Sequence, residues 1–312
     1  MNRSTVETSF AKSPFQLAPD DVEVFAVGDV HGQAAAFEAM LAYVANVKTR
    51  PGRKRLLVQT GDVIDRGPEN LRAMDLALNA RELARVDEVV LLPGNHELML
   101  LEVLDDVAAA VVKDAFYGTH LDIWAMNGGR QVVDELMVAA NVQAETKNTL
   151  LNDKAALAHW LGDVFENGVL AETAPGAWLR ALRAGPDHVR VGQTLLVHAG
   201  VHPRLDQDRF LKTPRAGHRR AQHHWAWVRE PFLQWQRRFT DTNGDPMLVV
   251  HGHTPAFRKP VFRHENEKAV VACMDRMLTH GRLNVDAGAT ERPHVGGARL
   301  NADGYQMFVA QA

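Results

Sequence analysis

The chain has 312 residues, of which 46% are hydrophobic and 7% aromatic, and its 35 basic against 38 acidic side chains leave a formal charge of −3. This length is enough for one large domain or two small ones with a substantial core, and the composition excludes a fibrous or disordered chain. The nearly balanced charge argues against a protein that coats a polyanion, so no nucleic-acid partner is expected.

The N-terminal segment and the single cysteine bear on the compartment. The first twenty residues contain no apolar run that could form the core of a signal peptide, and no stretch approaches the roughly 18 apolar residues of a membrane span. Cys273 has no second cysteine with which to form an intrachain disulfide. These features predict a cytoplasmic protein without membrane association.

A short unit recurs along the chain: a run of apolar, β-prone residues followed by a cluster of Gly, Asp, His or Asn. Runs of four or five such residues bounded by turn residues are typical of buried strands. Six strands are predicted, in chain order, over residues 24–27, 56–58, 89–92, 195–197, 247–250 and 282–285. The polar clusters that follow them are GDVHG, GDVIDRG, GNHE, HAG, HGHT and DAG.

Between the early strands, apolar residues recur at three- and four-residue spacing, which predicts helices over residues 34–47 and 70–85. A longer helical region is expected from Glu97 to about Arg190, interrupted by a loop around residues 124–129, and a loop-rich segment from His202 to about Pro246. Strands that alternate with helices predict an α/β fold, in which ligands bind beyond the carboxyl ends of the strands. All six polar clusters fall at those ends.

The domain organisation is expected to be simple. No internal repeat or low-complexity segment divides the chain. We expect an N-terminal tail of residues 1–20 and one domain over residues 21–312. Two inserts, about 99–190 and 202–246, should cap the site rather than form domains of their own.

The side chains in the polar clusters are suited to holding metal ions. Asp and His are hard or borderline ligands, typical of Mn, Fe or Zn sites. Asp29, His31 and Asp62 could hold one ion, and a second could be held by Asp62, Asn95, His198 and His253. Two ions roughly 3.5–4 Å apart clamp the attacking and leaving oxygens of a phosphoryl displacement. Any one cluster alone is better explained as a helix cap or a turn, so the inference depends on five clusters in order.

The motifs GDVHG, GDVIDRG, GNHE, HAG and HGHTP, in this order, resemble those of the calcineurin-type metallophosphoesterases. More narrowly, the chain is similar to the bacterial and bacteriophage Ser/Thr protein phosphatases of the PPP superfamily, from about Val24 to Gly288. Further matches to this branch are Trp124 with Asn127-Gly128-Gly129, Trp227-Val228-Arg229-Glu230, and Val285-Asp286-Ala287-Gly288. The resemblance implies a metallophosphoesterase-type β-sandwich flanked by helices, with helical and loop inserts over the site.

The resemblance also implies an activity and a role for each motif residue. The activity is a dinuclear-metal-dependent phosphomonoesterase acting on phosphoserine and phosphothreonine proteins, with phosphotyrosine a further candidate, by direct attack of a metal-bridging hydroxide. Mn²⁺ is the first expectation for both ions, with Fe or Zn as alternatives. His96 would be the general acid, oriented by Asp65, and Arg66 and Arg229 would hold phosphate oxygens. The implied metal ligands are Asp29, His31, Asp62, Asn95, His198 and His253.

Two departures from the wider family refine these assignments. Many relatives carry GHxH, but Pro255 stands here in place of the second His. His253 is therefore assigned to the metal, and His251 is expected to be a structural neighbour. Asp65 and Glu97 favour the phosphatases over the related symmetrical dinucleotide hydrolases, which commonly lack that Asp and carry GNHD.

Two other functions are weighed against the phosphatase. A hydrolase of diadenosine polyphosphates or other nucleotides shares the metal motifs and is the main alternative. An inactive binding protein is disfavoured, because the ligand set, His96 and Arg66 are all present.

An Arg- and His-rich stretch from Arg215 to His224 lies in the second insert. It is expected to be a solvated loop, and the alternative is that it attracts an anionic substrate to the mouth of the site. The expected partner of the protein is a phosphoprotein or phosphopeptide substrate.

Overall fold

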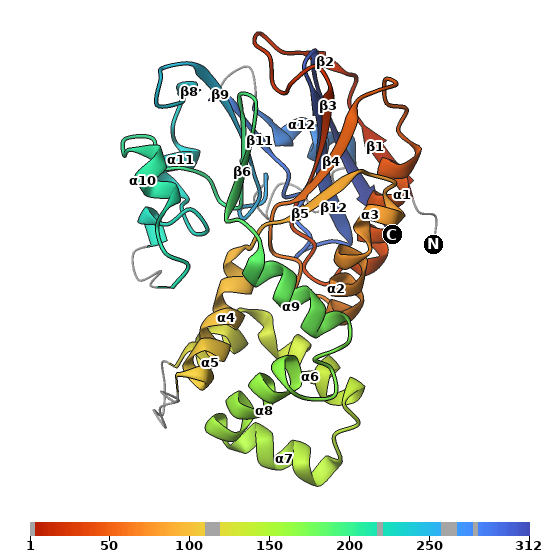
Figure 1. The fold of residues 1–312 in the computed structure, drawn as a ribbon, viewed down its shortest axis with the longest axis vertical. Helices are drawn as coiled ribbons and strands as arrows, with labels where there is room; N and C mark the ends of the chain where they lie inside the picture. Colours follow the sequence, from red (N-terminus) through yellow and green to blue (C-terminus); the bar gives the residue numbers. More distant parts are fainter. Residues whose placement is uncertain (1–3, 110–118, 217–220, 257–266, 277–279) are drawn as a thin grey trace.

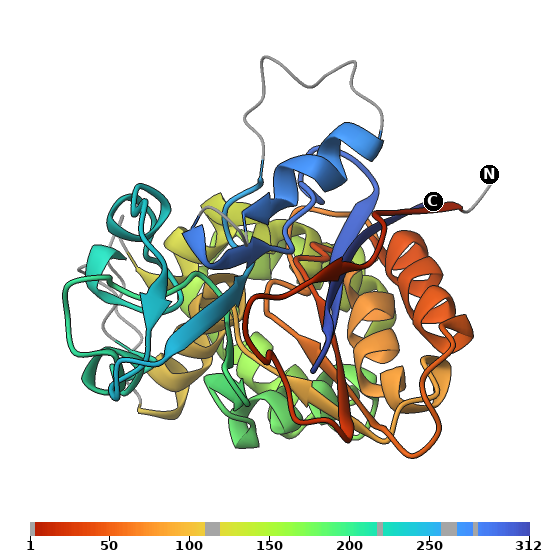
Figure 2. The same cartoon turned by 90° about the horizontal axis from the view of Figure 1, so that it is seen from above.

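The computed structural model describes residues 4–109, 119–216, 221–256, 267–276 and 280–312. Within these residues the strands form a seven-stranded and a six-stranded sheet, with helices packed outside them (Figures 1 and 2). Helices α4 to α9 lie together beyond one end of the sheets, in the lower half of Figure 1. The predicted class, an α/β fold with two sheets and flanking helices, is confirmed.

The first sheet combines a parallel half and an antiparallel half. Its order is β1 (Ser4–Glu7), β13 (Gly304–Gln311), β12 (His294–Asn301), β3 (Val22–Val27), β4 (Lys54–Gln59) and β5 (Glu88–Leu91), and β2 (Ala11–Lys12) also pairs with β13. Strands β3, β4 and β5 are parallel, whereas β12 runs antiparallel to both β3 and β13.

The second sheet also has a parallel centre. Its order is β10 (Asp275–Arg276), β11 (Arg282–Asn284), β9 (Pro246–His251), β7 (Thr194–Val197) and β6 (His188–Val191), and β8 (Phe239–Thr240) pairs with β9. Strands β11, β9 and β7 are parallel. The six predicted strands are β3, β4, β5, β7, β9 and β11, and all six are confirmed.

The alternation of side chains along β3 shows how the layers are built. Successive residues of a strand point to opposite faces of its sheet. Val24 and Ala26 belong to a buried cluster that also contains Val250 of β9, so this cluster fills the space between the two sheets. Phe25, between them, belongs to the second cluster, with Phe37 of α1 (Ala34–Asn46). Both faces of β3 are therefore buried, as expected for a central parallel strand.

The N-terminal segment, expected to be a tail, is part of the sheet. Strands β1 and β2 both pair with β13, near the other end of the chain. Leu17 and Ala18 are buried, and the Thr194 hydroxyl donates a hydrogen bond to the Leu17 carbonyl. Pairing with a strand about three hundred residues away is a tertiary contact, which local patterns do not indicate.

The helices of the first half depart from the prediction at two points. The helix predicted over 70–85 is divided at Asn79 into α2 (Asn70–Leu78) and α3 (Ala80–Leu83). The loop predicted around 124–129 is shorter than expected: Ala125–Gly129, the turn η1, joins α5 to α6 across a kink at Gly128. Gly128 accommodates the join with a φ of 113°, a value that residues with a Cβ rarely adopt.

The two inserts differ in regularity. The first contains α4 (Asn95–Ala108), α5 (His120–Trp124), α6 (Arg130–Ala139), α7 (Ala144–Asn152), α8 (Lys154–Glu166) and α9 (Ala174–Ala184). The described part of the second contains α10 (Gln207–Leu211), the 3₁₀ turn η2 (Ala221–His223), α11 (Glu230–Leu233) and β8, and α12 (Glu267–Met274) follows β9. No helix among the described residues combines the length and the apolar character of a membrane span.

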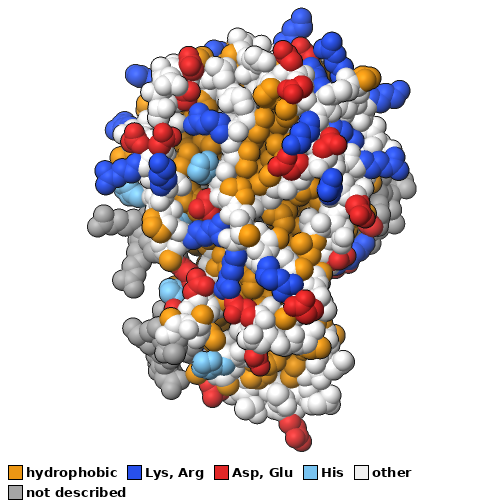
Figure 3. All heavy atoms as spheres, viewed as in Figure 1, with side chains coloured by type: hydrophobic (Ala, Val, Ile, Leu, Met, Phe, Trp, Pro, Cys, Tyr) orange, Lys and Arg blue, Asp and Glu red, His pale blue; other side chains and the backbone are white. Residues whose placement is uncertain are grey.

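One face of the molecule shows how charge and apolar side chains are distributed. In Figure 3, side chains of both charges are interspersed over this face, and hydrophobic ones gather in its upper half. Val89 and Val90 of β5 and Val189 of β6, at edges of the two sheets, are only half-buried.

Candidate active site

The polar clusters meet where the parallel strands of both sheets end. Strands β3 and β4 lead into the turns that carry the first clusters, β5 leads into the start of α4, and β7 and β9 lead into the last two. The six side chains implied as metal ligands are all at least 95% buried: Asp29, His31, Asp62, Asn95, His198 and His253. The structure therefore brings together residues that are up to 224 positions apart in the sequence.

Asp62 lies at the centre of the site. Its Oδ2 is 3.5 Å from His31 Nε2 and 4.0 Å from His96 Nε2, and its Oδ1 is 3.4 Å from His198 Nε2. Two groups with converging donor atoms share this carboxylate: His31, Asp62 and His96, and Asp62, His198 and His253. A carboxylate between two such groups is placed to bridge two cations.

Asp29 and Asn95 complete the two groups. Asp29 Oδ2 is 4.0 Å from His31 Nε2. Asn95 is the first residue of α4, but its side chain does not cap the helix. Its Oδ1 instead lies 3.0 Å from His198 Nε2 and 2.7 Å from His253 Nδ1. This amide oxygen therefore faces the site together with two imidazoles.

Two of the histidines are held in the orientation that metal ligation requires. His31 Nδ1 donates to the Ile64 carbonyl at 3.0 Å, and His198 Nδ1 donates to the Thr60 carbonyl at 2.9 Å. A backbone bond of this kind leaves the Nε2 lone pair directed into the site, as in known metal-bound histidines.

Besides the orientation of the histidines, the buried acidic side chains also indicate that the site is suited to cations. Asp29, Asp62 and Asp286 are all buried in one region. Burial, and then the charges of Asp286 and Asp62, raise the pKa of Asp29 well above its usual value. Burial likewise raises the pKa of Asp286 to about 6. Uncompensated carboxylates are costly in such a place, and divalent cations would neutralise them.

Metal binding should therefore release protons, and the affinity should rise with pH between about 5 and 7. Asp286, with a pKa of about 6, and Asp29 must lose protons before cations bind beside them, whereas burial lowers the pKa of His31 to about 4, so this ring is already neutral. Calorimetric titration with Mn²⁺ in two buffers of different ionisation enthalpy measures the proton count. Release at pH 6 should exceed release at pH 8; equal counts would contradict this account.

The site is built on strained turns. Of the seven non-glycine residues with positive φ in the described part of the chain, five lie in it: His31, Asp62, Asp65, Arg66 and His253. Such conformations cost of order 1–3 kcal/mol each and persist only where the surroundings fix them. One such constraint is the packing of Gly61 against Gly94, since a Cβ on Gly61 would lie 2.4 Å from the Gly94 nitrogen.

Glu97 is a further constraint on these turns. Its buried carboxylate accepts backbone N–H bonds from Asp62 at 2.7 Å, from Val63 at 2.8 Å and from Gly94 at 2.8 Å. It therefore joins the turn after β4 to the start of α4. The sequence identified Glu97 only as a family discriminator, because two of the N–H groups that donate to it lie 34 and 35 residues away in the chain.

Replacing Glu97 by Gln should lower the free energy of unfolding by about 2 kcal/mol, because the amide cannot accept all of these N–H bonds. Thermal or denaturant unfolding of the metal-free protein measures the loss. The matched control is Glu88→Gln, since Glu88 is half-exposed and pairs with Lys54 at the surface. The control should change stability by less than about 0.5 kcal/mol. Equal effects of the two variants would refute the structural role of Glu97.

Asp65 and His96 form a buried pair beside Asp62. Asp65 Oδ2 is 2.7 Å from His96 Nδ1. Burial raises the pKa of Asp65 and lowers the pKa of His96 well below its usual value. Because burial disfavours a charge on either group, the Oδ2···Nδ1 contact holds a single shared proton, and Nε2 is the ring nitrogen left to face the site. The pair can thus supply a proton from Nε2, the nitrogen nearer Asp62.

Two guanidinium groups are exposed at the mouth of the site. Arg66 Nε donates to the Asn127 carbonyl at 3.1 Å, and Arg229 Nε donates to the Thr254 hydroxyl at 3.2 Å. Burial, and then the charge of Arg66, lower the pKa of Arg229, against the attraction of Asp62. Both groups keep N–H donors that can bind phosphate oxygens in pairs.

His251 does not join either ligand group. Its Nδ1 donates to the Gly252 carbonyl at 3.0 Å, and the Phe232 ring packs edge-on 4.8 Å away. Burial lowers its pKa to about 3, so the ring is neutral.

The Arg215–His224 stretch is anchored at its two ends, whereas Ala216, Gln222 and His223 between them are exposed, as expected for a solvated loop. Arg215 pairs with Asp187 at 2.5 Å and donates to the Gly185 carbonyl at 2.6 Å, so it holds the second insert to the end of α9. His224 is buried and its ring contacts the Pro214 carbonyl. Residues 217–220, which include Arg219 and Arg220, lie outside the described residues.

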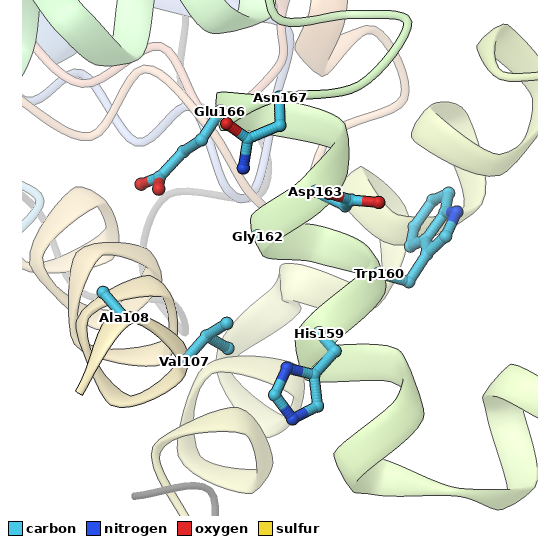
Figure 4. Close-up of a pocket in the computed structure, with 8 residues that line it drawn as sticks. All are labelled: Val107, Ala108, His159, Trp160, Gly162, Asp163, Glu166 and Asn167. Atoms are coloured by element: carbon cyan, nitrogen blue, oxygen red, sulfur yellow. The ribbon is translucent and has the colours of Figure 1, made fainter. Parts of the chain in front are cut away.

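A separate cavity of about 480 Å³ lies between α4 and α8 (Figure 4). Its lining contains none of the residues of the metal site: Val107, Ala108, His159, Trp160, Gly162, Asp163, Glu166 and Asn167. Of its two carboxylates, that of Glu166 pairs with Arg183 at 2.6 Å.

The fold and the site define a class: a two-sheet α/β protein with an Asp/His/Asn centre suited to divalent cations. Residues 22–285 match the calcineurin-like phosphoesterase family, and the chain belongs to it. This finding confirms the resemblance seen in the motifs. Metallophosphoesterases use divalent metals, and the two groups around Asp62 are the candidate sites for them.

Relatives with known names include hydrolases of two substrate classes. Serine/threonine-protein phosphatase 2 of Salmonella typhimurium is 27% identical over 205 residues, 60% of this chain and 77% of that protein. The symmetrical bis(5'-nucleosyl)-tetraphosphatase of Azotobacter vinelandii is 37% identical over 84 residues, which span only 27% of each chain. A solved cold-active protein tyrosine phosphatase is 19% identical, with 93% of this chain and 80% of that chain covered and a TM-score of 0.48.

Proposed function

We propose that the protein removes phosphate from phosphoserine and phosphothreonine in proteins or peptides, with phosphotyrosine as a further substrate. The observation that carries this proposal is the buried Asp65–His96 pair, at 2.7 Å, next to Asp62. A serine or threonine alkoxide is a poor leaving group and needs a proton from a general acid. The phosphate leaving group of a nucleotide polyphosphate is a stable anion and needs no such acid.

The chain's own residues would perform the remaining tasks. Arg66 and Arg229 bind the phosphate oxygens with paired N–H donors and stabilise the charge of the transition state. His96 gives its Nε2 proton to the leaving oxygen, while Asp65 holds the ring at Nδ1. Two divalent cations at the implied ligands, with Mn²⁺ expected, would supply Lewis acidity and lower the pKa of water.

One observation bears on the alternative function, hydrolysis of nucleotide polyphosphates. The similarity to the tetraphosphatase of Azotobacter vinelandii, 37% identity, is higher than that to the Salmonella typhimurium phosphatase, although the matched segment is shorter. An 84-residue match is too short to include all the motifs, so it supports relatedness of part of the chain and does not by itself favour a nucleotide substrate.

The test is phosphate release with Mn²⁺ from three substrates: a phosphoserine peptide, a phosphotyrosine peptide and diadenosine tetraphosphate, with Asp62→Asn as the blank. We expect the highest kcat/KM on the phosphoserine peptide. A higher value on the dinucleotide would overturn the protein phosphatase assignment and favour a nucleotide hydrolase.

A further inference from the structure

One turn of the first insert contacts both residues of the Asp-Arg pair. This turn, residues Trp124–Gly129, is called the Trp124 turn. The Trp124 indole Nε1 donates to Asp65 Oδ1 at 3.0 Å and to Asp65 Oδ2 at 2.9 Å. The Gly128 carbonyl accepts the Arg66 backbone N–H at 3.2 Å. The insert is therefore in direct contact with the residue that orients the proposed acid.

The contact between Trp124 and Asp65 is enclosed. Both side chains are fully buried. Asp65 also has a φ of 75°, a strained backbone conformation that the surrounding contacts must fix. A donor that reaches both carboxylate oxygens fixes the plane of the group. That plane decides whether Oδ2 faces His96.

The Trp124 turn docks without room for larger side chains. A Cβ on Gly129 would lie 2.4 Å from the Trp124 ring, and a Cβ on Gly128 would lie 2.5 Å from Arg66 Cγ. The Asn127 amide donates to the Ile123 carbonyl at 2.8 Å, which ties the turn to α5. The two glycines thus let the turn close onto both the indole ring and Arg66.

We propose that Trp124 is a positioning residue for proton transfer, and that the first insert therefore takes part in the reaction and does not only cap the site. Its N–H holds the Asp65 carboxylate, and Asp65 in turn holds His96 with Nε2 toward the leaving group. The inference rests on the proposed acid role of His96, and it applies to substrates with a poor leaving group, such as phosphoserine peptides.

The test compares Trp124→Phe with a matched control, Trp178→Phe. Trp178 is also a fully buried tryptophan of the first insert, but its indole N–H has no hydrogen-bond partner in the described part of the chain. Both variants remove an indole from a buried position, and only Trp124→Phe removes a bond to Asp65. The readout is kcat on p-nitrophenyl phosphate, which has a good leaving group, and on a phosphoserine peptide, which has a poor one.

For Trp124→Phe, kcat on the phosphoserine peptide should fall about 10-fold more than kcat on p-nitrophenyl phosphate. This difference is smaller than the full contribution of a general acid, about 10²–10⁴-fold, because His96 itself is still present. Trp178→Phe should change both rates by the same factor. In a variant that already carries Asp65→Asn, adding Trp124→Phe should not change the ratio of kcat on the phosphoserine peptide to kcat on p-nitrophenyl phosphate any further. Equal losses of Trp124→Phe on both substrates would overturn the proposal, provided that Asp65→Asn alone shows the unequal loss.

Failure of the acid role would give a different pattern. If Asp65→Asn itself lowers both rates equally, the acid role of His96 is refuted, and the role of Trp124 falls with it.

A readout independent of turnover is the indole N–H proton resonance of Trp124 in the metal-free protein, assigned by its loss in Trp124→Phe. It should shift on Asp65→Asn and stay unchanged on Asp134→Asn, an exposed acid of the same insert; no shift on Asp65→Asn would refute the hydrogen bond.

Discussion

Replacing Asp62 by Asn should reduce phosphate release by on the order of 10³-fold or more and weaken binding of both metals. One Asp62 oxygen faces His31 and His96, and the other faces His198. The carboxylate thus belongs to both candidate ligand groups. An amide at this position loses the negative charge and one of the two oxygens, so it can no longer serve both ligand groups.

The measurement pairs turnover with calorimetric titration of Mn²⁺, so that loss of metal is separated from loss of chemistry. The backbone of Asp62 is held by Glu97, so thermal unfolding of the metal-free variant shows whether the turn survives. The matched control is Asp134→Asn, an exposed acid that pairs with Lys147 on the insert. Near-normal activity of Asp62→Asn would refute the bridging assignment.

Replacing His96 by Asn should lower kcat for alkyl phosphates by about 10²–10⁴-fold, and much less for aryl phosphates with good leaving groups. His96 is buried, and its Nδ1 is held 2.7 Å from Asp65, so Nε2 is the only ring nitrogen free to serve the reaction. A leaving group that is already stable as an anion gains little from protonation. A larger loss of kcat on alkyl than on aryl phosphates would therefore identify His96 as the general acid.

The control for His96→Asn is a buried histidine of another motif, His251 at the end of β9. His251→Asn removes a neutral ring that bonds the Gly252 carbonyl and is not turned toward Asp62. Any effect of His251→Asn should be the same for alkyl and aryl phosphates. A uniform loss for His96→Asn as well would show that His96 is not the acid.

The prediction from sequence succeeded where short-range patterns carry the information. Each of the six strands is a local apolar run, and the side chains after it are delivered to the strand's carboxyl end by the chain itself. Because parallel strands end at one edge of a sheet, the motifs after β3 and β4 were enough to predict that Asp29 and Asp62 meet. His198 follows a strand of the second sheet and reaches them because the two sheets pack together. The family followed from the same motifs, because their types and order are specific.

Other features were decided only by contacts between distant segments. The pairing of β1 and β2 with β13 brought the expected tail into the sheet. The orientation of His31 and His198 depends on the carbonyls of Ile64 and Thr60, and the plane of Asp65 depends on Trp124, 59 residues away. Such bonds leave no periodic signal in the sequence, because each joins one polar atom to another across the fold. The sequence by itself therefore determined which side chains reach the site, and the tertiary structure decided how each of them is turned and held.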